Sequence, residues 1–433
     1  MVSEVKRKKM LMFINFFPPA AGGGVYRPLS FVKYLPSMSW DITVITPEEG
    51  EFWISDPSLE EEIPPSVRVI RTGSLSASRI LNSIKKGKGS GAATRSSGRF
   101  EIFRRIGEFL LLPDTYIGWV PFAVRSASRL CDREPFDLVY STSPPDSSHL
   151  AAGHISRKFN IRWVADFRDP WIGLYLRDPV TPIHRRIHRR MERRTAGADI
   201  VLVTTDWQKE KLLELYPDTR VVKIPNGYDS EKMYRYEEVR PDSGRFTILH
   251  SGMLTLGRKS RNFLEGLSIF MKRTGTGPES VHVIFAGAWE SGNRDSVYEF
   301  GLQDVVDFIG HLPHHECIRL EKKSHVLLLI KHDDERYRGL IPGKLYEYIG
   351  ARRPILAVVP EGEAEKIVRN LDRGETVSVS DPEDISRGLE KLYSLYREGR
   401  LESSYSLEEV SRYSRKAEAE VLNRVLLESI GDQ

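Results

Sequence analysis

The sequence predicts two α/β domains in tandem, each built on a parallel sheet with helices on both faces. Short runs of apolar residues, typical of buried strands, alternate with helical patterns along most of the chain. Runs that are apolar throughout belong to strands covered on both faces of a sheet. The series occurs twice, on either side of a polar, turn-rich stretch at residues 224–245. With 433 residues, 40% of them hydrophobic, the chain is long enough to bury two such cores.

Six apolar runs predict the strands of the first domain. Helical patterns or turns separate them, as expected for a doubly wound sheet. The runs are MLMFINF (10–16), DITVIT (41–46), VRVIRT (67–72), FDLVYST (136–142), RWVADF (162–167) and DIVLVTT (199–205).

Five further runs predict the strands of the second domain, with helices at 262–273 and 343–351 between them. The runs are FTILHSG (246–252), VHVIFAG (281–287), VVDFIG (305–310), HVLLLI (325–330) and PILAVV (354–359). The tail from about Leu401 has a helical pattern and is expected to pack back across the domain junction. We predict an N-terminal domain over residues 1–235, a C-terminal domain over 236–400 and a helical segment over 401–433.

Composition excludes several classes of protein. The net charge is +4, from 64 basic and 60 acidic residues, which describes a mixed surface and no nucleic-acid partner. Cys131 and Cys317 are far apart and lack metal-ligand spacing, so neither a disulfide framework nor a metal site is expected. No apolar stretch approaches the ~18 residues of a membrane span, and the N-terminus resembles a first strand more than a signal peptide. We expect a cytoplasmic protein, with peripheral attachment to the inner face of a membrane as an option.

Three consecutive glycines follow the first predicted strand, in FFPPAAGGGVYR (16–27). Gly22, Gly23 and Gly24 precede a helical pattern, and backbone N–H groups at a helix N-terminus suit phosphate or a crowded ligand. Glycine also lets a ligand lie directly against the backbone. The run is not GxGxxG, and no acidic residue follows the second strand at the fingerprint position, which disfavours a nicotinamide enzyme.

Four segments, in order, carry a resemblance to a known family. They are FFPPAAGGGVYRPLSFVKYLPSMSWDITVITP (16–47), DLVYSTSPPDSSHLAAGHISRKFNIRWVADFRDPW (137–171), ADIVLVTTDWQKEKLLELYPDTRVVKIPNGYD (198–229) and GLIPGKLYEYIGARRPILAVVP (339–360). Together they resemble the GT-B glycosyltransferases, specifically the family-4-like retaining group 1. The resemblance implies two Rossmann-like doubly wound domains facing an interdomain cleft. It also implies transfer of a sugar, of hexosyltransferase type, from a nucleotide-diphosphate sugar to a glycan, lipid-linked or small-molecule acceptor, without a metal or other cofactor.

The resemblance, read with the chemistry, points to a donor site in the second domain. A departing diphosphate needs cations and oriented N–H groups. Arg258 and Lys344 lie beside glycines near helix starts, and Gly252 and Gly343 are expected to adjoin the donor. Glu347 follows Lys344 by three residues on one helical face. In the family the matching glutamate binds the donor ribose hydroxyls, for which a carboxylate is a natural acceptor.

The first domain is expected to contribute the acceptor side. Ser143, Arg168 and Asp169 fall at predicted C-terminal ends of strands, where open α/β sheets bind ligands. Asp169 or Asp166 would orient the acceptor hydroxyl, and Arg168 would neutralise a phosphate. The alternative is that Arg168 and Asp169 pair with one another and cap a turn.

Two positions depart from the family pattern. Gly339 stands eight residues before Glu347, where the family usually has a first glutamate, and Met253 occupies the usual arginine position. Two alternatives therefore stay open beside the transferase: a GT-B sugar-nucleotide epimerase, and a non-catalytic GT-B binding scaffold.

Basic clusters in the first domain point to a second kind of partner. The segment 181–199 puts Arg185, Arg189 and Arg193 on one helical stripe, with Arg186, Arg190 and Arg194 on the next. A Gly-, Ser- and Lys-rich stretch at 80–99 is expected to form a basic loop, and FLLLPDTYIGWV (109–120) offers apolar anchors. An anionic membrane surface fits these features, and an ordinary solvated helix is the alternative.

Overall fold

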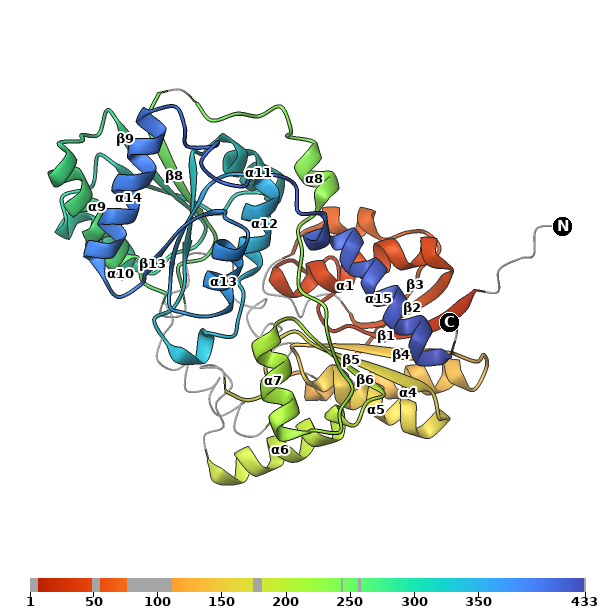
Figure 1. Cartoon of the computed structure of the whole chain (residues 1–433). Coiled ribbons are helices and arrows are strands. Elements are labelled where there is room, and N and C mark those ends of the chain that lie inside the picture. The colour runs from red at the N-terminus through yellow and green to blue at the C-terminus, as the bar shows by residue number, and fades with distance from the viewer. Residues whose placement is uncertain are drawn as a thin grey trace, which may run out of the picture. The chain divides into compact units, whose positions relative to one another are not determined.

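The computed structural model describes residues 7–48, 55–75, 111–173, 181–242, 244–255 and 258–431. They form two compact units, one comprising Met1–Pro225 with Lys416–Gln433 and the other Asn226–Arg415. Each unit is a Rossmann-like α/β domain with a parallel sheet between helices (Figure 1), so the predicted fold class is confirmed.

The first unit holds a seven-stranded sheet in the order β3-β2-β1-β4-β5-β6-β7, parallel throughout. All six predicted strands are present, and β7 is a short edge strand that the sequence did not indicate. The strands are β1 (Lys8–Phe13), β2 (Trp40–Pro47), β3 (Arg68–Thr72), β4 (Leu138–Ser143), β5 (Arg162–Phe167), β6 (Ile200–Val203) and β7 (Val221–Lys223).

Alternate residues of the inner strand β1 belong to two separate cores. Met10 and Met12 pack under α1 (Gly23–Tyr34) and α15 (Arg415–Ile430). Leu11 and Phe13 belong to the core of the other face, which is covered by α4 (Val120–Cys131), α5 (Ser147–Phe159), α6 (Pro182–Ala196) and α7 (Asp206–Leu215). The period of two along a strand is the reason for this division.

The C-terminal helix α15 belongs to the first unit although it follows the second in sequence. Its apolar residues Leu422 and Leu426 are buried in the core beneath α1. The indole nitrogen of Trp40 donates to Asn423 at 2.7 Å, which fixes the helix against the start of β2.

The second unit holds a six-stranded parallel sheet in the order β10-β9-β8-β11-β12-β13. The five predicted strands are present, and β13 is an edge strand that the sequence did not indicate. The strands are β8 (Phe246–Ser251), β9 (Val281–Ala286), β10 (Val306–Gly310), β11 (Val326–Ile330), β12 (Ile355–Val359) and β13 (Gly374–Ser378).

Helices cover both faces of this second sheet. One core lies under α9 (Arg261–Thr274), α10 (Ser291–Glu299) and α14 (Pro382–Arg397). The other lies under α8 (Ser230–Tyr234), α11 (His314–Lys323), α12 (Gly343–Ala351) and α13 (Glu363–Asn370). Helices α9 and α12 confirm the two that the sequence placed between strands. Among the described residues, no helix is long and apolar enough to cross a bilayer.

Short 3₁₀ helices complete the described chain. They are η1 (Leu35–Met38), η2 (Pro57–Glu62), η3 (Ile117–Trp119), η5 (Glu335–Tyr337) and η6 (Ser411–Tyr413).

Candidate functional site

In the second unit, three predicted donor-side residues meet where β8 ends and α12 begins. Lys344, in the first turn of α12, places its ammonium nitrogen 2.9 Å from Oε2 of Glu347. Gly252 directly follows β8 with φ +147°, and a Cβ built on it would lie 3.6 Å from Cγ of Lys344. The backbone of Gly252 therefore lies against the lysine stem, and a side chain there would be strained by the positive φ. Gly343 opens α12 with free space where a Cβ would point.

Glu347 lies between two nitrogen groups. Its Oε1 is 3.0 Å from Nε2 of His314 on α11, while Oε2 accepts from Lys344. Burial alone would raise the pKa of Glu347, but the Lys344 ammonium and the contact with His314 hold that pKa well below its usual range. Glu347 is thus a carboxylate at neutral pH, held in one orientation at the first turns of α12.

A second buried carboxyl group, Glu321 on α11, lies beside this pair. Its Oε1 accepts from the Ser251 hydroxyl at 2.5 Å, and within the described chain its Oε2 has no hydrogen-bond partner. Burial, with the negative charge of Glu347 adding to it, raises the pKa of Glu321 to about 7, although Lys344 opposes the shift. Sequence reasoning missed this residue. The available signal was its position three residues after buried Ile318, on the apolar face of α11.

Arg258 joins the same region from the loop before α9. Its Nη1 donates to the carbonyl of Met253 at 2.9 Å, and its Nε has no partner among the described residues. Burial lowers the pKa of Arg258. Burial lowers the pKa of His250 to about 3, and the positive charges of Arg258 and Lys344 add to this shift. His250 is therefore neutral. Its Nδ1 lies 2.8 Å from the carbonyl of Leu328.

Lys331 is a further cation that the sequence did not single out. It directly follows β11, and its ammonium donates to the carbonyls of Tyr337 and Leu340, both at 2.7 Å. Burial, with the positive charge of Arg258 adding to it, lowers the pKa of Lys331 to about 8. The region thus holds three cations, Arg258, Lys331 and Lys344, against the carboxyl groups of Glu347 and Glu321, with His250 neutral, and this excess of positive charge suits an anionic ligand. In the described chain, no group of three or more His, Cys, Asp or Glu side chains is arranged to hold a metal ion.

In the first unit, Arg168 connects two other backbone segments to its own at the carboxyl end of the sheet. Its guanidinium donates to the carbonyls of Gly24, Ser143 (2.7 Å) and Pro144 (2.8 Å). Burial lowers the pKa of Arg168. The first turn of α1 and the end of β4 are therefore fixed to the residue that follows β5. This brings Gly24, predicted for the donor side, together with Ser143 and Arg168, predicted for the acceptor side.

The neighbouring predicted residues differ in how open they are. Gly22 has φ +112°, and a Cβ on either Gly22 or Gly23 would meet nothing within 4 Å. Ser143 is fully buried, and its hydroxyl has no partner among the described residues. Asp169 is partly buried. No ion pair between Arg168 and Asp169 occurs in the described part of the chain.

Asp166, the alternative to Asp169 on the acceptor side, has a structural role. It is fully buried and accepts from Nε and Nη2 of Arg27, at 2.9 and 3.1 Å, and from the Tyr140 hydroxyl at 2.7 Å. Arg27 also reaches Glu418 on α15 at 3.4 Å. Asp166 therefore holds α1 against β5, which leaves Asp169 as the candidate.

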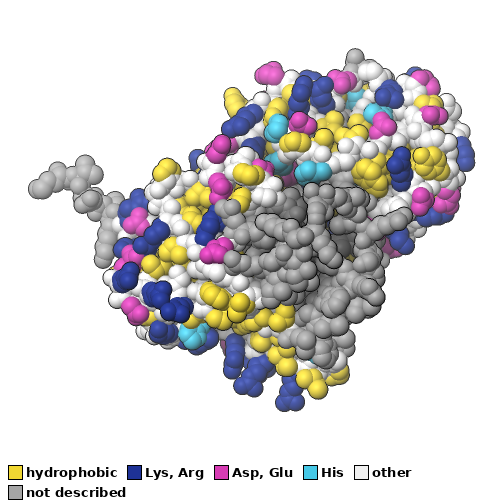
Figure 2. Space-filling model, turned by 180° about the vertical axis from the view of Figure 1, so that it is seen from behind, with side chains coloured by type: hydrophobic (Ala, Val, Ile, Leu, Met, Phe, Trp, Pro, Cys, Tyr) yellow, Lys and Arg dark blue, Asp and Glu magenta, His cyan; other side chains and the backbone are white. Residues whose placement is uncertain are grey.

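The basic clusters are described in part. Helix α6 carries exposed Arg185, Arg186, Arg190, Arg193 and Arg194, while Arg189 pairs with Glu192 at 2.7 Å. Basic side chains gather beside hydrophobic ones in the lower part of Figure 2, and Figure 1 places α6 at the lower end of this unit.

Two of the segments proposed to meet a membrane lie wholly or partly outside the described residues. The basic stretch at 80–99 lies wholly outside them, as do Phe109 and Leu110. In the described part of the apolar segment, Trp119 is fully buried and its indole donates to Thr72 at 2.8 Å. Trp119 is therefore a core residue, so the expectation of an exposed anchor is wrong at this position.

Two Rossmann-like units, each with polar side chains at the carboxyl ends of parallel strands, are the architecture of the GT-B fold. Two family matches agree with this architecture. Residues 22–227 match the family described as Glycosyl transferase 4-like domain, and residues 239–410 match Glycosyl transferases group 1. The chain belongs to the group 1 glycosyltransferases with the GT-B fold.

Solved structures support the same fold at low sequence identity. HepE from Anabaena, in complex with UDP and glucose, aligns with a TM-score of 0.62 at 14% identity, covering 98% of this chain and 100% of that one. Sucrose-phosphate synthase from Thermosynechococcus elongatus aligns with 0.65 at 15% identity, covering 99% and 100%. A Listeria monocytogenes protein described as a putative UDP-N-acetylglucosamine 2-epimerase aligns with 0.55 at 11% identity, covering 99% and 98%. No curated protein matches the sequence significantly.

Proposed function

We propose that this glycosyltransferase moves a hexose from a nucleotide-diphosphate sugar, with retention, to a glycan, lipid-linked or small-molecule acceptor. The observation that carries the proposal is the arrangement of Lys344, Glu347 and His314 at the start of α12, with Arg258 and Gly252 beside them. The solved HepE complex, which contains UDP and glucose, supports a nucleotide-sugar donor. Neither a metal nor another cofactor is included in the proposal.

Glu347 has the acceptor capacity that a ribose requires. Each carboxylate oxygen offers about two lone-pair sites. Lys344 uses one site on Oε2 and His314 contacts Oε1, so each oxygen keeps one site for a ribose hydroxyl. In this proposal Lys344 orients the carboxylate and at the same time directs its positive charge toward the diphosphate.

Charge stabilisation on the leaving diphosphate would come from the same region. Negative charge on the diphosphate grows as the glycosidic bond breaks, and fixed cations stabilise it most where water is excluded. Lys344 and the guanidinium of Arg258 would supply this stabilisation, together with the backbone N–H groups at Gly343 that open α12. Arg258 keeps an Nε donor without a partner in the described chain, which fits a role in binding.

On the first unit, we propose that Asp169 orients the acceptor hydroxyl. Asp169 is partly buried and follows Arg168, whose three bonds to carbonyls fix this edge of the sheet. Ser143 and Arg168 would then shape the acceptor side, and the open backbone at Gly22 and Gly23 would admit the sugar or diphosphate, with Gly24 packed behind it against Phe16 and Arg168. Arg168 uses three of its five N–H donors on carbonyls, which leaves two for a phosphate group.

The test is a panel of nucleotide sugars screened by thermal shift on the full chain, followed by calorimetry with the stabilising donor. Glu347→Ala should weaken nucleotide binding by about 1–3 kcal/mol, or roughly 5- to 150-fold in Kd, because charged hydrogen bonds to the ribose are lost. The matched control is Glu299→Ala, which removes an exposed carboxylate of the same unit that pairs with Arg261. Equal affinity in a folded Glu347→Ala variant would exclude this residue from the donor site.

Incubation of the donor with and without acceptors separates the two alternatives from transfer. An epimerase would change the sugar of the donor with no acceptor present, and a scaffold would bind the donor and release it unchanged. Transfer predicts release of the nucleoside diphosphate together with a glycosylated product. The anomeric configuration of that product, read by NMR, tests retention.

A further inference from the structure

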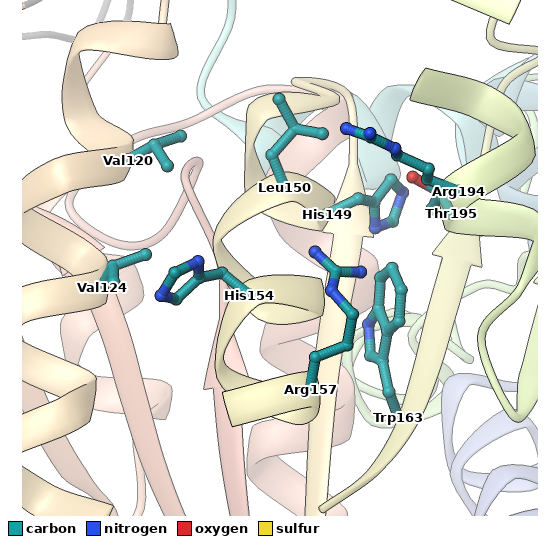
Figure 3. Close-up of a pocket in the computed structure, with 9 residues that line it drawn as sticks. All are labelled: Val120, Val124, His149, Leu150, His154, Arg157, Trp163, Arg194 and Thr195. Carbon is teal, nitrogen blue, oxygen red and sulfur yellow. The ribbon is translucent and has the colours of Figure 1, made fainter. Parts of the chain in front are cut away.

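A cavity of about 220 Å³ lies in the first unit among α4, α5 and α6 (Figure 3). It is separate from the residues assigned above to donor and acceptor, because Gly22, Ser143, Arg168 and Asp169 do not line it. Its walls differ in chemistry: Val120 and Val124 on α4 with Leu150 on α5 form an apolar side, and arginines of α5 and α6 lie opposite.

Two arginines of this cavity lack partners. Arg157 on α5 and Arg194 on α6 make no hydrogen bond or ion pair within the described chain, and no Asp or Glu is among the lining residues. Nearby Arg162 and Arg189 do pair, with Asp199 and Glu192. Figure 3 shows the guanidinium groups of Arg157 and Arg194 extending from their two helices toward the space around His149. Two unpaired guanidinium groups that converge without a carboxylate make a site for an anion.

The floor of the cavity is built before any ligand arrives. The indole of Trp163 donates to the Ser141 hydroxyl oxygen at 2.9 Å, and that oxygen lies 2.8 Å from Nδ1 of buried His149. Because an indole N–H can only donate, the hydroxyl hydrogen of Ser141 stays available for His149. The absence of a side chain at Gly153 lets α5 lie directly on the indole, since a Cβ there would be 2.9 Å from Cζ3 of Trp163. Trp163 and His149 are therefore fixed, and a ligand would not have to order them.

We propose that this cavity binds a phosphate group attached to a small apolar or neutral moiety. A phosphate matches two guanidinium groups because each can bind it with parallel N–H donors. The apolar wall of Val120, Val124 and Leu150 would contact the attached moiety. The volume is below the ~300–1,000 Å³ of drug-sized pockets, so the cavity suits a headgroup-sized ligand. Free phosphomonoesters and phospholipid headgroups share this chemistry.

The experiment compares two probes on the full chain. Calorimetry with glycerol 3-phosphate tests the free ester, and co-sedimentation with phosphatidylcholine vesicles, with or without phosphatidic acid, tests the lipid source. The cavity variant is Arg157→Gln with Arg194→Gln. The matched control is Arg129→Gln with Arg133→Gln, which removes the same charge from exposed positions of the same unit that neither line the cavity nor belong to α6.

The expected result is a loss of at least tenfold in affinity for one probe in the cavity variant, with the control variant binding like the parent chain. The probe that shows this loss identifies the source of the phosphate. Equal weakening in both variants would overturn the proposal, because it would show general attraction by surface charge. Absence of binding to both probes in the parent chain would also overturn it. Circular dichroism and thermal melting of both variants establish that they are folded.

Discussion

Replacing Glu321 with glutamine should change how the stability of the second unit depends on pH. Glutamine keeps an oxygen that can accept from Ser251, and it cannot ionise. The parent side chain is fully buried, one of its oxygens has no partner in the described chain, and its pKa is raised from 4.5 to about 7. Its ionisation is therefore the property that the substitution removes.

The sign follows from proton binding. Because the folded state holds the Glu321 proton more tightly than the unfolded state, the free energy of unfolding falls as pH rises between about 4.5 and 7. At about 1.4 kcal/mol per pH unit, the loss amounts to ~3 kcal/mol above pH 7 and is absent below pH 4.5. Glu321→Gln removes this dependence. Any cost of placing an amide in the site is the same at every pH, so the difference between pH 5 and pH 8 isolates the carboxyl group.

Hydrogen exchange on the full chain is the appropriate assay, because a two-domain protein does not unfold in a single two-state step. Protection of the amides of β8 and β11 reports opening of the second unit. Relative to the parent chain, Glu321→Gln should gain ~2.5 kcal/mol of protection between pH 5 and pH 8, and the exposed control Glu299→Gln should gain none. Parallel pH curves for Glu321→Gln and the parent would refute the assignment of a raised pKa to Glu321.

Three further predictions concern the first unit. Arg27→Met should cost about 3–5 kcal/mol of protection against hydrogen exchange in β1 and β5, because Asp166 would remain buried without its cation. Arg7→Gln, which removes an exposed pair with Asp41, should cost at most about 1 kcal/mol, and equal losses of protection in the two variants would contradict this view. Gly23→Val should reduce turnover with little change in Tm, since a Cβ there meets no atom within 4 Å. Gly22→Ala should instead lower Tm, because Gly22 has a positive φ. Full activity of Gly23→Val would exclude the turn from the substrate site. Reversal of Arg185, Arg189 and Arg193 to Glu should weaken sedimentation with anionic liposomes at low salt, and binding that does not respond to this reversal would identify α6 as a solvated helix.

The fold could be predicted from the sequence wherever a strand is buried on both faces. The long apolar runs of both sheets were all found as strands. The two strands that were missed, β7 (Val221–Lys223) and β13 (Gly374–Ser378), are edge strands with partly exposed residues. An edge strand pairs with one neighbouring strand only, and helices cover it less completely than an inner strand. Its sequence therefore need not be apolar.

The sequence could predict only those contacts of the donor-side residues that form within one helix. Lys344 and Glu347 are three positions apart on α12, and helical spacing alone predicts that they meet. His314 and Glu321 belong to α11 and reach the same place through tertiary packing. Single-sequence periodicity describes the apolar face of α11, and it does not indicate which polar side chains that face brings against α12.

The glycine turn before α1 illustrates how residues outside a motif determine what the motif can do. Three glycines are costly to order, because glycine loses more conformational freedom on folding than other residues. Two buried arginines offset this cost from different directions: Arg27 fixes α1 to Asp166 on β5, and Arg168 binds the carbonyl of Gly24. The backbone at Gly22 and Gly23 nevertheless stays open, with no atom where their side chains would be. The open space at this turn therefore exists in the unliganded chain, and a ligand that enters it does not have to order the glycines.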